Sequence, residues 1–95
     1  MSVLVQMSVR PRDYGTFADA VAWMNGQGMP KGLHSSRVYR EEGDPGVVCV
    51  LQEWDSHAAF HESSDEIGDE FNRRAGTEGL EWETHIWADS GIAAI

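Results

Sequence analysis

The chain has 95 residues, which leaves room for one domain with one hydrophobic core. Sixteen Asp and Glu against seven Lys and Arg give a formal net charge of -9 at pH 7, which excludes nucleic acid and anionic membranes as expected partners. No signal-peptide pattern opens the sequence and its single cysteine cannot form an intrachain disulfide, so we expect a cytoplasmic protein.

The first elements are a strand, a helix and a loop. Alternating apolar residues predict a strand over residues 3–9, which Pro11 ends because proline cannot donate to a strand ladder. Asp13 can cap a helix that ends near Asn25. The segment GQGMPKG at 26–32 holds three glycines and a proline, which indicates a loop.

Two strands follow with a short connection. Residues 35–41 alternate like a strand, EGDPG at 42–46 reads as a turn, and VVCVLQEW at 47–54 reads as a third strand. Strands joined so closely should form an antiparallel hairpin. The apolar start of the third strand predicts that it lies inside the sheet.

A second helical segment and a last strand complete the pattern. Asp55 or Ser56 can cap the helix. A second capping signal, SSDE at 63–66, predicts a break there and a longer helical piece over 65–75. Alternation predicts a final strand over 80–87.

The predicted order β-α-β-β-α-β is that of an α+β, ferredoxin-like antiparallel sheet. We expect a single domain over residues 1–95, with its core in 3–87 and a C-terminal tail at 88–95. The helices should cover one face of the sheet. The other face is partly apolar, and because large apolar patches are rare on monomers we expect a homodimer.

The segment VVCVLQEWDSHAAFHESSDE at 47–66 resembles the antibiotic biosynthesis monooxygenase (ABM) family of dimeric α+β barrels, and the resemblance extends over 3–87. Its matching features are a strand-end Trp54, a polar cap, Ala59-Phe60 at the helix start and the Ser63-Ser64 pair. The resemblance implies a dimeric barrel. It also implies a cofactor-independent monooxygenase that acts on an aromatic or quinone-like small molecule with molecular oxygen.

The same superfamily leaves other functions open. One alternative is a non-catalytic dimeric protein that binds small ligands or responds to stress. The family's polyketide oxygenases resemble this chain at Trp54, but their Asn and Tyr positions hold Val50 and Phe60. Haem binding or haem degradation is a weaker alternative, because Gln6 replaces the first-strand Asn of haem degraders and no Trp stands in the second helix.

Two histidines are the candidate proton carriers. His57 and His61 are four residues apart and lie one above the other on a helix. The unperturbed imidazole pKa of about 6.5 suits a base at neutral pH. The alternative is that both histidines are solvated residues at a helix start, where they make only local hydrogen bonds. A shared metal is a third possibility, but a closed site needs more ligands than the pattern offers, so we expect no metal.

Aromatic residues are the candidates for lining a site. Trp54 can donate its indole N–H to a substrate or can simply pack in the core. Phe60 should lie beside it, and Trp23, Tyr39 and Trp82 are further lining or core candidates.

Three other residues are expected to lie outside the site. His85 should point away from Trp82 on the last strand, and His34 should lie exposed in a loop. Cys49 sits in an apolar strand and is expected to be inert packing.

Overall fold

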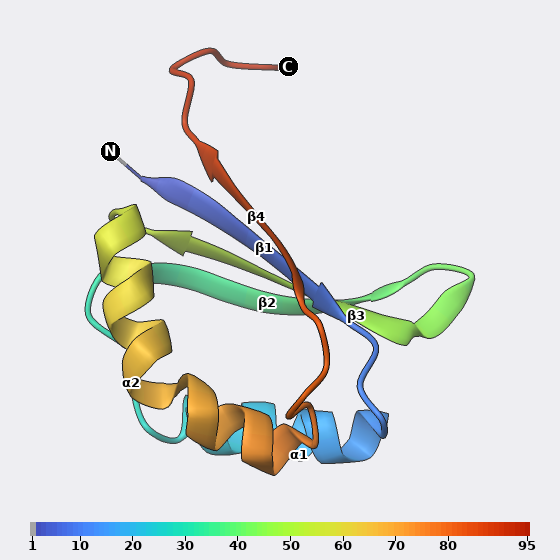
Figure 1. The fold of residues 1–95 in the computed structure, drawn as a ribbon. Coiled ribbons are helices and arrows are strands. Elements are labelled where there is room, and N and C mark those ends of the chain that lie inside the picture. Colours follow the sequence, from blue (N-terminus) through green and yellow to red (C-terminus); the bar gives the residue numbers. More distant parts are fainter. Residues whose placement is uncertain (1) are drawn as a thin grey trace.

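The computed structural model describes residues 2–95, which form one sheet and two helices (Figure 1). The elements are β1 (Val3–Val9), α1 (Tyr14–Asn25), β2 (Leu33–Glu41), β3 (Asp44–Trp54), α2 (His57–Ala75) and β4 (Glu83–Ala88). This order confirms the predicted ferredoxin-like arrangement.

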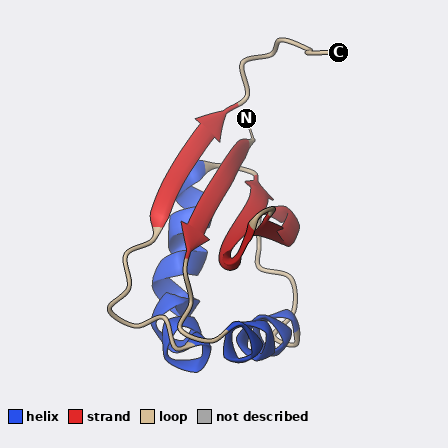
Figure 2. Ribbon diagram, turned by 90° about the vertical axis from the view of Figure 1, so that its right-hand side faces the viewer, coloured by secondary structure: helices blue, strands red, loops and turns tan. Residues whose placement is uncertain are grey.

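The four strands pair antiparallel in the order β2-β3-β1-β4. The hairpin of β2 and β3 and the inner position of β3 are therefore confirmed. Both helices lie on one side of the sheet (Figures 1 and 2), and the residues after β4 run away from the rest of the domain. No helix within residues 2–95 is long and apolar enough to cross a membrane.

The strand register divides the sheet into a helix-facing side and an outer side. Val5 is opposite Gln52, and Met7 is opposite Val50, in the paired strands β1 and β3. Because side chains alternate, these four residues share the helix-facing side and their neighbours share the outer side. Residues of the outer side include Leu4, Gln6, Tyr39, Cys49, Leu51, His85 and Trp87.

The core lies between the sheet and the helices. Phe17 of α1 is 1% exposed and meets Phe71 of α2 edge-on, with ring centroids 5.7 Å apart. A second cluster joins Val5, Trp54 and Phe60 at the other end of the sheet. The two clusters hold both helices to one face and leave a space between them.

Helix α2 is continuous over 19 residues, so the predicted break at Ser63-Ser64 is wrong. Ser56 caps its start by accepting from the Ala59 N–H at 3.1 Å, and Gly76 ends it in the left-handed conformation at φ 70°. Two serines cost only about 0.5 kcal/mol each in a helix. Burial of Phe60 and Phe71 on one helix outweighs that cost.

The starts of three strands also differ from the sequence-based expectation. β3 begins at Asp44 and not at residue 47, so the last three residues of the expected turn belong to the strand. β2 begins at Leu33, so His34 lies in a strand and not in a loop, at a register shift against β3. β4 begins at Glu83 and not at residue 80. The Leu80 N–H instead donates to the Thr77 carbonyl, which continues the preceding turn.

Gly32 directly precedes β2 and lies against Ala59 near the start of α2. An alanine at this position should lower the stability of the fold. Its φ is 89°, and an added Cβ would lie 2.9 Å from the Ala59 Cβ. We expect Gly32→Ala to lower the free energy of unfolding by about 1–3 kcal/mol through backbone strain. Displacement of the Ala59 methyl should cost about 1–3 kcal/mol more.

Gly43 provides the matched control for this substitution. It has nearly the same φ, 90°, but nothing lies within 4 Å of an added Cβ. Urea unfolding should therefore show a smaller loss for Gly43→Ala than for Gly32→Ala. Equal losses would show that contact with Ala59 does not constrain Gly32.

Candidate functional site

A cavity of about 1110 Å³ lies between the helix-facing side of the sheet, the two helices and the loop after α1. Its aromatic walls are Trp23, Trp54, Phe60, Phe71 and Trp82. Polar side chains also line it: Asn25, Gln27, Ser36, Gln52, His61, Ser63, Ser64, Glu66, Glu70, Asn72 and Thr84. A cavity that combines aromatic walls with polar side chains can bind a small molecule.

The cavity brings together most of the residues predicted from sequence. Trp54, Phe60, His61, Trp23 and Trp82 all line it, although they come from four separate segments of the chain.

Two predicted residues lie outside this lining. Tyr39 is on the outer side of the sheet opposite Cys49 and is 47% exposed, so it has no place in the cavity. The expectation that Tyr39 lines the site together with Trp54 and Phe60 is therefore wrong. His57 and His61 are both exposed; His61 lines the cavity, whereas His57 is connected to it only through its contact with His61.

Trp54 belongs to a buried chain of hydrogen bonds. Its indole N–H donates to Gln52 Oε1 at 3.0 Å, and Gln52 Nε2 donates to Ser36 Oγ at 3.1 Å. An indole has only one N–H to donate, so Trp54 serves as a wall here while its donor is held by Gln52. The role of Trp54 as a donor to substrate therefore has no support in this geometry.

Gln52 was missed by the sequence reasoning. It is 7% exposed and lines the cavity, and it stands two residues before Trp54 on the same strand face. Gln52 could have been found as the one polar residue that shares the strand face of Val48, Val50 and Trp54.

The two histidines form a pair at the start of α2. Their Nε2 atoms are 2.7 Å apart, and their rings stack at 4.5 Å with an interplanar angle of 28°. In this contact one ring donates its N–H and the other ring accepts it. The contact links His61, which lines the cavity, to His57, which does not.

The described residues around His57 and His61 do not form a metal site. Within residues 2–95 no group of three or more His, Cys, Asp or Glu side chains is arranged to hold a metal ion. A closed zinc site takes four ligands.

Trp82 carries a buried donor that is free in this structure. Its Nε1 is the one buried side-chain nitrogen or oxygen within residues 2–95 that lacks a hydrogen-bond partner. Its ring packs near Phe17, with centroids 6.4 Å apart, and lines the cavity. An unmade buried hydrogen bond costs about 1–3 kcal/mol, and packing of the Trp82 ring offsets that cost.

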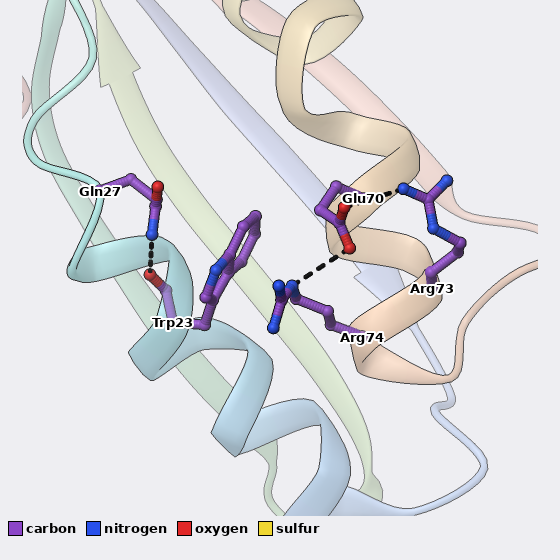
Figure 3. A network of polar contacts seen from close by, with 5 residues as sticks. All are labelled: Trp23, Gln27, Glu70, Arg73 and Arg74. Atoms are coloured by element: carbon purple, nitrogen blue, oxygen red, sulfur yellow. Dashed lines mark hydrogen bonds and ion pairs between the residues drawn. The ribbon is translucent and has the colours of Figure 1, made fainter.

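A cluster of charged side chains on α2 lies beside Trp23 of α1 (Figure 3). Glu70 accepts from Arg73 at 2.9 Å and from Arg74 at 3.1 Å, each on a different carboxylate oxygen. The hydrogen bond from Arg73 is the main reason that the pKa of Glu70 is lowered. The Arg74 guanidinium also lies 4.3 Å from the centre of the Trp23 ring, a cation–π contact between the helices.

The remaining candidates lie away from the cavity. His85 stacks on Trp87 on the outer side of the sheet, which confirms its predicted direction. His34 is exposed as expected and contacts Asp55. Burial raises the pKa of the Cys49 thiol, which agrees with its expected inert role.

Comparison with known proteins connects this geometry to a family. The sequence profile described as "Antibiotic biosynthesis monooxygenase" matches residues 1–76. A search of curated protein sequences finds no match.

Solved structures share the fold. Rv0793 from Mycobacterium tuberculosis is 18% identical with a TM-score of 0.76, and the alignment covers 99% of this chain and 100% of that one. A conserved protein from Methanosarcina mazei is 17% identical, with 92% and 91% covered and a TM-score of 0.75. SnoaB from Streptomyces nogalater, a cofactor-independent oxygenase, is 17% identical, with 93% and 92% covered and a TM-score of 0.66.

Proposed function

We propose that this chain, which belongs to the antibiotic biosynthesis monooxygenase family, is a cofactor-independent oxygenase of an aromatic or quinone-like small molecule. The observation that carries the proposal is the cavity itself, in which five aromatic side chains surround a space that also contains one histidine, His61. Aromatic walls hold a planar ring, and a histidine in contact with it can remove an acidic proton.

The proposed reaction needs only a base, a dry site and oxygen. His61 takes one proton from the reactive methylene carbon of an anthrone-type substrate, and the carbanion adds molecular oxygen to form a peroxide. The peroxide takes up a proton and loses water, which leaves a ketone at that carbon. One oxygen atom enters the ketone and the other enters water, so the four electrons lost by carbon reduce one O₂.

Gln52 is the proposed orienting group. It lines the cavity, and its second amide N–H can donate to a carbonyl or to the enolate oxygen that forms during proton removal. Gln52 is fixed by its bonds to Trp54 and Ser36, so its position is set before a ligand arrives.

Oxygen consumption with anthrone and hydroquinone compounds tests this function. We expect uptake above the rate without protein, with one O₂ consumed per anthrone converted to anthraquinone. Tryptophan fluorescence measured in parallel reports binding, because three tryptophans line the cavity. Binding with no protein-dependent uptake would overturn the oxygenase proposal.

That outcome would favour the second candidate function, a non-catalytic protein that binds small molecules. Two observations support it. Val50 and Phe60 line the cavity at the positions where the family's polyketide oxygenases carry polar residues, and the indole N–H of Trp54 is held by Gln52.

A homodimer through the outer side of the sheet is part of the proposal. Leu4 and Trp87 are cross-strand neighbours there and are 42% and 56% exposed. Burial of such an apolar surface against a second sheet would produce the barrel that the family resemblance implies.

Leu4→Lys is expected to separate the dimer without harm to the single chain. The new ammonium would stand opposite Glu53 in the same chain, while a second sheet would have to bury it. Sedimentation should show one chain's mass for this variant and two for the unmodified chain.

Met29→Lys is the control, because Met29 is exposed on the loop after α1 and does not belong to the outer side of the sheet. This variant should keep the mass of two chains. An unmodified protein that sediments as one chain would contradict the proposed dimer.

A further inference from the structure

The charged residues that line the cavity are all acidic. Glu66 and Glu70 are among the lining residues, and no lysine or arginine is. A site built for a carboxylate or phosphate normally offers a guanidinium or ammonium to pair with it. This cavity instead presents negatively charged side chains.

The two carboxylates differ in how they are engaged. Both oxygens of Glu70 are held by Arg73 and Arg74, which themselves do not line the cavity. Glu66 makes no ion pair or side-chain hydrogen bond within residues 2–95. Its charge therefore remains available to a ligand.

Most charged side chains on the same helix as Glu66 are also negative. α2 carries five carboxylates, Glu62, Asp65, Glu66, Asp69 and Glu70, against the two guanidiniums of Arg73 and Arg74. The whole chain has a net charge of -9, so its field attracts cations and repels anions. The charges on α2 and the net charge of the chain therefore both favour a cationic ligand over an anionic one.

The aromatic walls suit the same class of ligand. Trp23, Trp54 and Trp82 present indole rings, which attract a cationic group as well as a planar ring. One of them, Trp23, is already engaged by Arg74 on one face.

We infer that the cavity selects neutral or cationic aromatic molecules over anionic ones, with Glu66 as the group that distinguishes them. This inference rests on the proposed function, because it names the substrate class of the same site. It predicts that the natural substrate lacks a free carboxylate and carries hydroxyl, carbonyl or basic nitrogen substituents.

Three ligands with one ring and different charges test the inference. They are 2-naphthylmethylammonium, 2-naphthalenemethanol and 2-naphthoate, with binding followed by tryptophan fluorescence at low and at physiological ionic strength. The ammonium compound should bind about tenfold more tightly than the carboxylate at low salt, with the alcohol between them. The difference should shrink as salt screens it.

Glu66→Gln should reduce this difference to about threefold or less, because it removes the free carboxylate and keeps the side-chain size. Glu62→Gln is the matched control, since Glu62 is an exposed carboxylate of the same helix that does not line the cavity. It should leave the selectivity unchanged.

The outcomes separate the two proposals. If all three ligands bind equally, or if the carboxylate binds best, the charge selectivity is overturned and the aromatic site stands. If Glu66→Gln and Glu62→Gln have equal effects, Glu66 is not the selecting group and the inference fails. If no ligand binds, the aromatic site itself is overturned.

Discussion

Replacement of His61 by alanine is expected to lower protein-dependent oxygen uptake by about 10²–10⁴-fold, the usual contribution of a general base. His61 is the one histidine among the residues that line the cavity, so its loss leaves no other imidazole in contact with a bound ring. Binding of the substrate should change little, because the five aromatic walls remain. Oxygen-electrode rates and fluorescence titrations of the same preparations separate the two effects.

His57→Ala should have a much smaller effect, about tenfold or less, because His57 only relays a proton that His61 has already taken. His85→Ala is the control, since His85 lies on the outer side of the sheet. Unchanged turnover in His61→Ala would remove this residue from the mechanism. A larger loss in His57→Ala would reverse the two roles.

Phe17→Ala is expected to lower the free energy of unfolding by about 3–5 kcal/mol. The ring is almost fully buried and meets Phe71 and Trp82, which joins α1, α2 and the segment before β4. A small domain is stabilised by only about 5–15 kcal/mol in total, so this loss is a large part of its margin. Urea unfolding followed by circular dichroism measures it.

Met29→Ala is the comparison for this variant. It also removes a large apolar side chain, but Met29 is 69% exposed, and we expect a change within about 0.5 kcal/mol. If the two variants lose similar stability, Phe17 does not anchor the helices to each other. In that case the walls of the cavity must be held by other contacts.

The fold was predictable because its elements have clear periodicities. The alternation over Val3–Val9 and the apolar start of β3 are local signals, and they agree with the sheet that forms. The interior of α2 was not predictable in the same way. A capping pattern at Ser63 to Glu66 is a local preference, whereas packing of Phe60 and Phe71 on both sides of it decides that the helix continues.

The site was predictable in part. Trp54, Phe60 and His61 are close in sequence and line the same cavity. Tyr39 could not be assigned from sequence, because alternation shows that two residues face opposite ways but not which of them faces the helices. The bond from Trp54 to Gln52 depends on side-chain geometry that no spacing reveals.

A crystal structure of the chain with anthraquinone, the product of the proposed anthrone reaction, would locate the oxygenase site. We expect the ring system between Trp54, Phe60 and Trp82, with one carbonyl oxygen about 3 Å from the His61 imidazole. A ring bound outside the cavity, or bound within it with no polar atom in reach of His61, would show that His61 is not the base of an oxygenase reaction in this cavity.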